Sequence, residues 1–362
     1  MKVMDRYVLR SFLGIFIGSL LSVSFLFTVL SVLDSITFVM SEDGATIPGV
    51  VRFYLLQLPQ TIYMSAPVAA LLSAMITLGG LNQNHELMAL RASGISLLRA
   101  ATPILLASVI ISGGAFVLGN TLVPVGNRYF LSEKQVIKGE EPDPGESVWY
   151  VSESRGENPV ILNIEKVDRQ TGELAGVTIF RTGPGLALLE EITAAKALYV
   201  PGRGWRLLRA ETRAFHGHDV PAISSSPEMM IALPDTPEDL LRVQRAPEEM
   251  TLAQLADQIA RVRRYGLPET AYRVERQARF AIPLAAVILV LAGIPLAIRP
   301  VRSGGLAWGI LGAIIVGFIY FVVIAEFISL GKGGMVEPWV AAWSANIIFG
   351  IIGAAQFAKL RR

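Results

Sequence analysis

Six stretches of almost entirely apolar residues, none of which contains a charged side chain, dominate the hydrophobic pattern of this chain. They form two groups of three, at residues 11–33, 63–81 and 100–119 and at residues 280–298, 306–325 and 338–358. Each stretch has about 19 to 23 residues and is therefore long enough to cross a hydrocarbon layer about 30 Å thick. The pattern predicts an α-helical polytopic membrane protein with six transmembrane helices in a 3 + 3 arrangement.

Between the two groups the pattern changes, and apolar and polar residues alternate. Alternating runs such as residues 160–167 and 205–210 are separated by turn-forming residues such as those at 201–204. Short strands at intervals of about 8–12 residues indicate a β-sandwich or a jelly roll. We therefore predict three parts: an N-terminal membrane half at residues 1–124, an inserted all-β, jellyroll-like domain at residues 125–250 and a C-terminal membrane half at residues 251–362.

A helical pattern returns directly after the alternating region. Apolar residues recur at helical spacing between positions 252 and 262, and Thr251 and Gln254 have the spacing of a capping box. Gly266 suits the end of this helix, and Pro268 suits the first turn of the next. The second helix is predicted to continue without a break into the fourth span, over about 30 residues in all.

The distribution of positive charge predicts the orientation in the membrane. The loops on one side hold two positive residues, Arg52 and Lys332, whereas those on the other side hold ten: Lys2, Arg6, Arg10, Arg91, Arg99, Arg299, Arg302, Lys359, Arg361 and Arg362. Short loops rich in Lys and Arg stay in the cytoplasm. Both termini are therefore predicted to be cytoplasmic, and the segment 125–277 is predicted to lie on the opposite side.

Composition and motifs exclude several kinds of chemistry. The chain has no cysteine, so disulfides and thiolate metal sites are excluded. It contains no Walker A motif, no H-E-x-x-H and no G-x-S-x-G. His216 and His218 read as residues of a turn between strands, and we predict no metal site, no catalytic residue and no cofactor bound by this chain. Ionisable residues are nearly absent from the spans, which argues against an ion-coupled transporter. The energy for any transport is then expected from a partner.

The polar connection between the second and third spans is a candidate docking element. Leu87, Leu90, Ile95 and Leu98 recur at helical spacing, which predicts a short helix broken near Ser93 and Gly94. A short amphipathic helix with an exposed acid is suited to bind another protein. An ordinary turn at the membrane interface is the alternative.

Two charged features near the outer ends of spans are candidate lipid contacts. Six arginines precede the fourth span and suit phosphate groups, although pairing with Glu269 and Glu275 on a solvated helix is the alternative: Arg261, Arg263, Arg264, Arg273, Arg276 and Arg279. Glu326 follows a long uncharged run in the fifth span. An acid at that depth is either functional or reaches the interface.

Three stretches of the sequence resemble a known protein family, and the resemblance extends over essentially the whole chain. They are MDRYVLRSF near the start, PVAALLSAMITLGGLNQNHELMALRASGIS around the cytoplasmic connection, and LPETAYRVERQARFAIPLAAVILVLAGIPLAI leading into the fourth span. With the 3 + 3 layout, they resemble the lipopolysaccharide export permeases (the LptF/LptG, or YjgP/YjgQ, family), and they are closer to the G-type subunit.

The resemblance implies a fold, partners and an activity. The chain would pair with a homologous permease subunit as an F/G heterodimer in the bacterial inner membrane, above a cytoplasmic homodimeric ATPase that binds ATP and Mg²⁺. Lipopolysaccharide would enter from the membrane and pass to periplasmic jellyroll bridge proteins, which include a single-span membrane partner. The chain itself would be non-catalytic and would bind no nucleic acid.

The resemblance also implies site residues. The coupling helix corresponds to residues 82–95, with the ATPase-coupling residues Glu86, Leu87, Leu90, Arg91 and Gly94. The lateral gate would involve Phe25, Val29, Val32, Tyr320, Ile324 and Glu326. G-type relatives can carry lysines at the outer end of span 1, but this chain has none there. The lipid headgroup would therefore be bound by Arg52, Arg273, Arg276 and Arg279.

Two other functions compete with this reading. A non-transporting membrane scaffold could present a β domain to periplasmic partners, but it would need no acidic docking helix. The permease of another lipid or lipoprotein extractor usually has four spans with the large domain after the first, and the 3 + 3 count argues against it.

Overall fold

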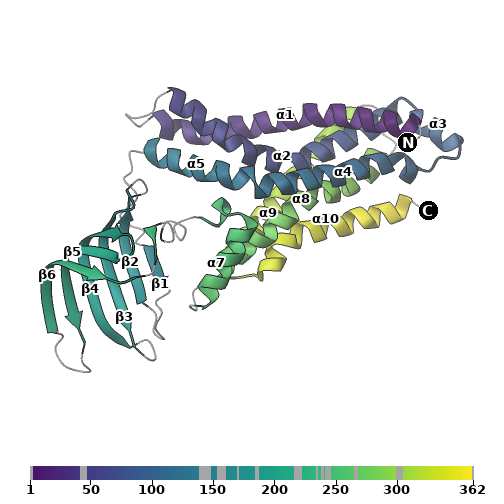
Figure 1. Cartoon of the computed structure of the whole chain (residues 1–362). Coiled ribbons are helices and arrows are strands. Elements are labelled where there is room, and N and C mark those ends of the chain that lie inside the picture. The colour runs from purple at the N-terminus through teal and green to yellow at the C-terminus, as the bar shows by residue number, and fades with distance from the viewer. Residues whose placement is uncertain are drawn as a thin grey trace. The chain divides into compact units, whose positions relative to one another are not determined.

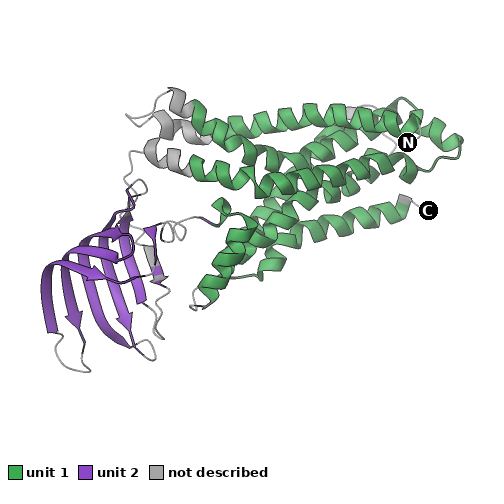
Figure 2. Ribbon diagram, viewed as in Figure 1, with its two compact units in different colours: residues 1–138, 247–263, 267–362 green, residues 139–246, 264–266 purple. Residues whose placement is uncertain are grey.

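The computed structural model of the chain describes residues 3–40, 47–137, 148–152, 160–168, 171–183, 187–215, 222–233, 235–237, 240, 246–264, 268–298 and 305–360. The chain forms two compact units (Figure 2). Unit 1 is helical and comprises Met1–Lys138, Pro247–Arg263 and Leu267–Arg362. Unit 2 contains the β-sheet and comprises Gly139–Ala246 and Arg264–Gly266.

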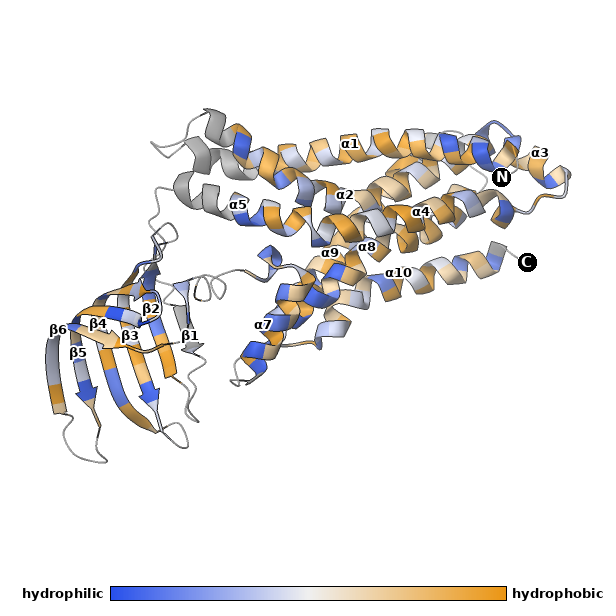
Figure 3. Ribbon diagram, viewed as in Figure 1, coloured by the Kyte–Doolittle hydropathy of each residue, from blue (hydrophilic) through white to orange (hydrophobic). Residues whose placement is uncertain are grey.

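Among the described residues, six helices of unit 1 are long and apolar enough to span a membrane (Figures 1 and 3). They are α1 (Val3–Met40), α2 (Ile47–Gln83), α4 (Leu97–Asn120), α8 (Thr270–Ala297), α9 (Gly305–Lys332) and α10 (Pro338–Leu360). Shorter helices complete the unit: α3 (Glu86–Ala92), α5 (Leu122–Ile137), the 3-10 helix η2 (Pro247–Glu249) and α7 (Leu252–Arg264). The helical polytopic fold with an inserted β domain is confirmed.

The second spanning helix is much longer than its apolar stretch predicts. α2 has 37 residues and contains Pro59 and Pro67, so at 1.5 Å per residue it is about 55 Å long. Proline is tolerated inside a membrane helix because neighbouring groups satisfy the carbonyl that it frees. Arg52 consequently lies in the second turn of a helix and not in a loop.

Helix α5 was not predicted, and the expected domain boundary at residue 125 falls inside it. Pro124 and Gly126 suggest a turn in the sequence, but proline is compatible with the first turn of a helix. Gly126 is required by packing, because a Cβ at this position would lie 2.7 Å from the backbone oxygen of Leu56 in α2. Unit 2 accordingly begins only after α5.

The spanning helices differ in how much of their apolar surface unit 1 covers. The apolar windows of α2 and α8 are mostly buried, whereas few residues in those of α1 and α9 are buried. Because all of these helices are apolar, this difference identifies α2 and α8 as the centre of the bundle. α1 and α9 present apolar surface to lipid or to another membrane protein.

The helices that follow the β domain agree with the sequence analysis. The backbone N–H of Thr251 donates to Gln254 Oε1 (3.0 Å) and the backbone N–H of Gln254 donates to Thr251 Oγ1 (3.4 Å), which confirms the capping box. α8 has 28 residues and includes the fourth span without a break, as predicted. Pro268 precedes α8, and Gly266 lies outside the described residues.

Unit 2 contains one six-stranded antiparallel sheet in which the strands follow in chain order. The strands are β1 (Val148–Ser152), β2 (Val160–Val167), β3 (Leu174–Thr182), β4 (Leu188–Val200), β5 (Gly204–Ala214) and β6 (Ala222–Ile231). Tyr150, Leu162, Ile179 and Ile192 face one another across β1 to β4, and all four are buried. The period-two pattern thus places its apolar residues on one face of the sheet.

Asp235, a buried residue in the segment after β6, forms hydrogen bonds with residues of β1 and β5. The carboxylate of Asp235 accepts hydrogen bonds from the hydroxyls of Tyr150 and Ser152 in β1. Its backbone oxygen accepts from Trp205 Nε1 in β5 (2.8 Å). Leu233 and Leu240, on either side of Asp235, belong to the buried apolar cluster of the sheet. The segment therefore closes the core of unit 2.

Replacing Asp235 by alanine is expected to destabilise unit 2 by about 2–4 kcal/mol, because two buried hydroxyls lose their acceptor. Chemical unfolding of the whole chain in detergent, with proteolysis of the β domain as the readout, measures the change. Glu190→Ala is the matched control, since it removes only an exposed ion pair with Arg181 worth about 1 kcal/mol or less. Equal losses in the two variants would contradict the role given to Asp235.

Candidate functional site

The short helix α3 connects α2 to α4 at the end of unit 1 where the chain begins (Figure 1). His85 precedes it in the left-handed region, with φ +60°. At the other end the backbone N–H of Ile95 donates to the Leu90 oxygen and that of Gly94 to the Arg91 oxygen, both at 3.0 Å. This is a Schellman motif, and the positive φ of Gly94 (+82°) permits it. The predicted break near residues 93 and 94 is confirmed.

The side chains of α3 divide into an anchor and an exposed surface. Leu87 is buried against unit 1 and Leu90 is half-buried. Met88 and Arg91 are exposed, and Glu86 is partly exposed. Two leucines thus fix the helix, and an acid, a base and a methionine are left for contact with another molecule.

The carboxylate of Glu86 has one weak contact with α1. The hydroxyl of Tyr7 lies 3.5 Å from Glu86 Oε1, at the outer limit of a hydrogen bond. Over the described part of the chain, no lysine or arginine forms an ion pair with Glu86. The carboxylate is therefore available to a cationic group on a partner.

The beginning of α1 is fixed beside α3 by two contacts that the sequence analysis did not identify. Arg99 Nη2 donates to Asp5 Oδ2 (2.9 Å), and Asp5 is buried. The Ser73 hydroxyl donates to the backbone oxygen of Phe12 (2.7 Å). Asp5 and Arg99 are 94 residues apart, so no local pattern could pair them. The position of Asp5, an acid before the first apolar span, was the one signal in the sequence for such a contact.

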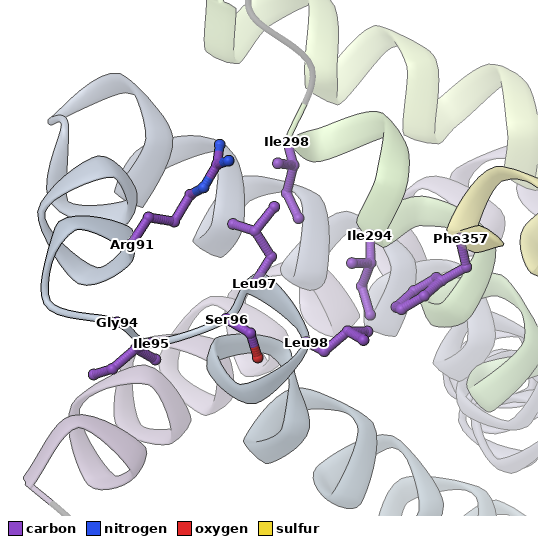
Figure 4. A pocket seen from close by; sticks show the side chains of 9 residues that line it. All are labelled: Arg91, Gly94, Ile95, Ser96, Leu97, Leu98, Ile294, Ile298 and Phe357. Atoms are coloured by element: carbon purple, nitrogen blue, oxygen red, sulfur yellow. The ribbon is translucent and has the colours of Figure 1, made fainter. Parts of the chain in front are cut away.

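A cavity of about 360 Å³ lies beside α3 (Figure 4). Leu98, Ile294 and Phe357 come from α4, α8 and α10 and point toward one another in it. The remaining lining residues are Arg91, Gly94, Ile95, Ser96, Leu97 and Ile298. The cavity is mainly apolar with a guanidinium at its edge, so it suits an apolar side chain that lies next to an acidic group.

The arginines before the fourth span are largely paired. Arg263 donates to both carboxylate oxygens of Glu269 (2.9 Å each), and Arg273 Nη1 donates to Glu269 Oε1 (3.3 Å). The hydrogen bond from Arg263 holds the pKa of the Glu269 carboxyl below its ordinary value, and the same bond raises the pKa of Arg263. Pairing with Glu269 is the alternative to phosphate binding for these arginines, and Arg263 and Arg273 form such pairs in the structure.

The predicted headgroup residues lie in different environments. Arg52 is exposed, and Arg273 and Arg276 are half-buried. Arg276 makes no ion pair within the described residues. Arg276 is therefore a partly accessible member of the predicted set that lies outside the Glu269 pairs, and Arg52 is an exposed member.

Arg279, the fourth predicted headgroup residue, is buried in this structure. The residue is 3% exposed. Its Nε donates to Glu275 Oε1 (2.9 Å), its Nη2 donates to the backbone oxygen of Glu248 (2.8 Å), and its Nη1 donates to the backbone oxygen of Gly119. A guanidinium removed from water needs such partners, and here the protein supplies them.

Two of the predicted gate residues face the interior of the bundle. Tyr320 and Ile324 are buried. The Tyr320 hydroxyl donates to Asn346 Oδ1 (3.0 Å), and Asn346 Nδ2 donates to the backbone oxygen of Ala281 (2.7 Å). The polar tip of Tyr320 is thus satisfied by α10, and the role of Tyr320 and Ile324 at a lateral gate stays a prediction.

The other predicted gate residues remain at the surface. Phe25 is 72% exposed, Val29 and Val32 are half-buried, and Glu326 is exposed. Phe27 of α1 and Phe321 of α9 pack edge to face with their ring centroids 6.0 Å apart. α1 and α9 therefore contact each other at this pair of rings.

Histidine and carboxylate groups give no metal site in the part of the chain that the structure describes. His216 and His218 lie outside the described residues, as do Lys2, Arg299, Arg302, Arg361 and Arg362.

Comparison with known proteins shows which family the sequence matches. The sequence model of the lipopolysaccharide export system permeases LptF/LptG matches residues 6–359. The chain is also similar to the lipopolysaccharide export system permease protein LptG of Escherichia coli strain K12 and to its namesake from E. coli O6:H1 strain CFT073. Each is 21% identical over 353 residues, covering 97% of this chain and 96% of the relative. The match includes all six spanning helices and the inserted sheet.

Proposed function

This chain belongs to the LptF/LptG family of lipopolysaccharide export permeases, and on that premise we propose that it is the permease subunit of an ATP-binding-cassette transporter that extracts lipopolysaccharide from the bacterial inner membrane. The family match over nearly the whole chain, together with an acidic helix exposed at one end of a six-helix bundle, carries the proposal. In this role the chain has no catalytic group of its own, and it moves lipid with energy supplied by a partner.

The proposed orientation places both termini and α3 in the cytoplasm and unit 2 in the periplasm. The excess of Lys and Arg in one set of short loops supports it. The structure adds that α3 and the two ends of the chain lie at the same end of unit 1 (Figure 1). Lys359 near the C-terminus and Arg91 in α3 thus belong to one positively charged end.

The proposed partner at this end is a homodimeric ATPase that binds ATP and Mg²⁺. Glu86 would pair with a cationic residue of the ATPase, and Leu87 and Leu90 would hold α3 to the bundle. Gly94 would terminate the helix so that Arg91 remains exposed. The cavity beside α3 would receive an apolar side chain from the same partner.

Making this cavity polar is expected to weaken ATPase binding about tenfold, because an apolar side chain of the partner would be placed against an amide. Leu98→Asn is the test variant, since Leu98 lines the cavity and is partly exposed. Leu98→Met keeps the volume and the apolar character and is the control. Titration of the detergent-purified chain with the ATPase gives the affinities, and equal affinities for the two variants would remove the cavity from the interface.

A homologous permease subunit would pair with this chain through the exposed apolar surfaces of α1 and α9. Phe25, Val29 and Val32 on α1 and Glu326 on α9 would then border the entry of the lipid. Exposing acyl chains to water costs about 0.8 kcal/mol per CH₂. A shielded path between two permeases would lower this cost for a lipid with several acyl chains.

The lipid headgroup would be bound by Arg52, Arg276 and Arg273, because these arginines are at least partly accessible. Guanidinium groups bind phosphates through paired hydrogen bonds. Unit 2 would receive the lipid and pass it to periplasmic bridge proteins with similar β domains, including one with a single membrane span.

Co-purification tests this proposal. The tagged chain would be expressed with a candidate ATPase, a candidate partner permease and lipopolysaccharide, and it would be isolated in mild detergent. The proposal predicts that both proteins and the lipid are recovered with the chain. A scaffold without transport function would bring down neither the ATPase nor the lipid, and that result would contradict the proposal.

A further inference from the structure

Glu248 lies at the centre of a group of polar contacts that neither the family nor the proposed function explains. Its backbone oxygen accepts from Arg279 Nη2 (2.8 Å) and from Asn127 Nδ2 (3.3 Å). Its carboxylate forms an ion pair with Lys332. Arg279 also donates to the backbone oxygen of Gly119. We call this group the Glu248 junction: Gly119, Asn127, Glu248, Arg279 and Lys332.

The electrostatics of the junction favour its charged form. Burial alone raises the pKa of the Glu248 carboxyl, but the hydrogen bond from Lys332 and its charge outweigh burial and lower it. Arg279 is almost completely buried and is balanced by Glu275. The ion pair between Glu248 and Lys332 is half-buried, and it lies beside Arg279, which is buried and hydrogen-bonded. Such a pair has a better defined geometry than an ion pair on an open surface.

The junction joins elements that are far apart in the sequence. Asn127 belongs to α5, the last helix before unit 2, and Glu248 belongs to η2, the first element after unit 2. The hydrogen bond between them therefore links the two chain connections of the inserted domain. Gly119, Arg279 and Lys332 add the end of α4, the first half of α8 and the end of α9.

We propose that the Glu248 junction keeps the two connections of the β domain fixed to α8 and α9, so that movement of these spans is transmitted to the domain that receives the lipid. The inference rests on the proposed function of the chain. Asn127, Glu248, Arg279 and Lys332 are positioning residues in this scheme, because they act through the elements that they hold. Without the junction, the spans would move while the β domain did not follow.

The ion pair between Glu248 and Lys332 is the part of the junction that can be changed without removing the buried arginine. Glu248→Lys and Lys332→Glu each place like charges together, whereas the double variant restores an opposite pair. Asp257→Lys is the matched control, since Asp257 is an exposed acid on the neighbouring helix α7. All variants would be assembled with the ATPase and the partner permease in proteoliposomes that contain lipopolysaccharide. ATP hydrolysis and lipid release to a soluble β-domain acceptor are measured on the same samples.

Each single reversal is expected to lower lipid release by about fivefold or more, the lower range of coupling between sites, with ATP hydrolysis within about twofold of wild type. More ATP is then hydrolysed per lipid released. The double variant is expected to recover at least about half of the release, as two residues in direct contact should. Asp257→Lys is expected to behave as wild type.

Two results would overturn the inference while the proposed function stands. One is unchanged release in both single variants. The other is a parallel fall of hydrolysis and release with no recovery in the double variant, which would assign the pair to folding alone. Failure of the wild-type complex to release lipid would instead contradict the proposed function, and the inference with it.

Discussion

Replacing Glu86 by alanine is expected to reduce the affinity of the chain for its ATPase at least about 30-fold, corresponding to about 2 kcal/mol or more for one side of a desolvated charge pair at an interface. The helix itself should persist, because alanine favours helix and Leu87 and the Schellman motif at Gly94 are untouched. The loss would therefore report the charge and not the fold. Titration of the purified chain with the ATPase measures it, and nucleotide hydrolysis in the assembled complex shows whether coupling is lost as well.

Two further variants show whether the loss of affinity is due to the charge of Glu86. Glu86→Gln keeps the shape and removes the charge, so it is expected to fall between wild type and Glu86→Ala. Glu337→Ala removes an exposed acid in the connection between α9 and α10 and is expected to have no effect on ATPase binding. Binding of Glu86→Ala within about twofold of wild type would remove α3 as the acidic docking element, because a charge pair of this kind contributes far more.

Replacing Arg279 by glutamine is expected to destabilise unit 1 by about 3–5 kcal/mol, the cost of leaving one partner of a buried ion pair alone. Glu275 would lose its cation, the backbone oxygen of Gly119 would lose the guanidinium donor, and that of Glu248 would keep only Asn127. Thermal unfolding of the whole chain in detergent, followed by tryptophan fluorescence, measures the loss. Trp339 and Trp343 lie in α10 of unit 1 and report on it.

Arg273→Gln is the matched control for Arg279→Gln. Arg273 belongs to the same helix, but it is half-buried and pairs with Glu269 at an accessible site. Such pairs contribute about 1 kcal/mol or less, so little change in stability is expected. If the two variants unfolded alike, the contacts of Arg279 would not stabilise the bundle.

The spans could be predicted from the sequence because uncharged apolar stretches of this length have one common explanation in a membrane protein. The inserted sheet could be predicted because one of its faces is buried, which enforces the alternation seen in β1 to β5. The capping box at Thr251 and the end of α3 near Gly94 are local features. Each depends on residues only a few positions apart, so the sequence contains the whole signal.

The faces of the spanning helices could not be predicted in the same way. A helix that is apolar all round has no polar side to indicate which residues face the bundle. Tyr320 and Ile324 were accordingly placed at a gate although they are buried beside α8 and α10. Phe25 lies on an equally apolar helix and is exposed. Only the packing of the folded chain distinguishes these positions.

Contacts between distant residues were the second kind of feature that the sequence did not reveal. Arg279 resembles its neighbours Arg273 and Arg276 in sequence, yet its partners Gly119 and Glu248 come from other parts of the chain. Asp235 closes the sheet through Tyr150 and Ser152, more than 80 residues earlier. Helix α5 was missed for a related reason, since Gly126 reflects a close approach to α2 and not a turn.

We propose that this chain moves lipopolysaccharide when a partner hydrolyses ATP, and a lipid-transfer assay shows whether it does. Proteoliposomes containing lipopolysaccharide and the complex of this chain, its partner permease and the ATPase would be given ATP in the presence of a soluble β-domain acceptor. The proposed function predicts lipid transfer to the acceptor that requires ATP and is lost with Glu86→Ala. Transfer that is independent of ATP, or absent from an intact complex that hydrolyses ATP normally, would contradict it.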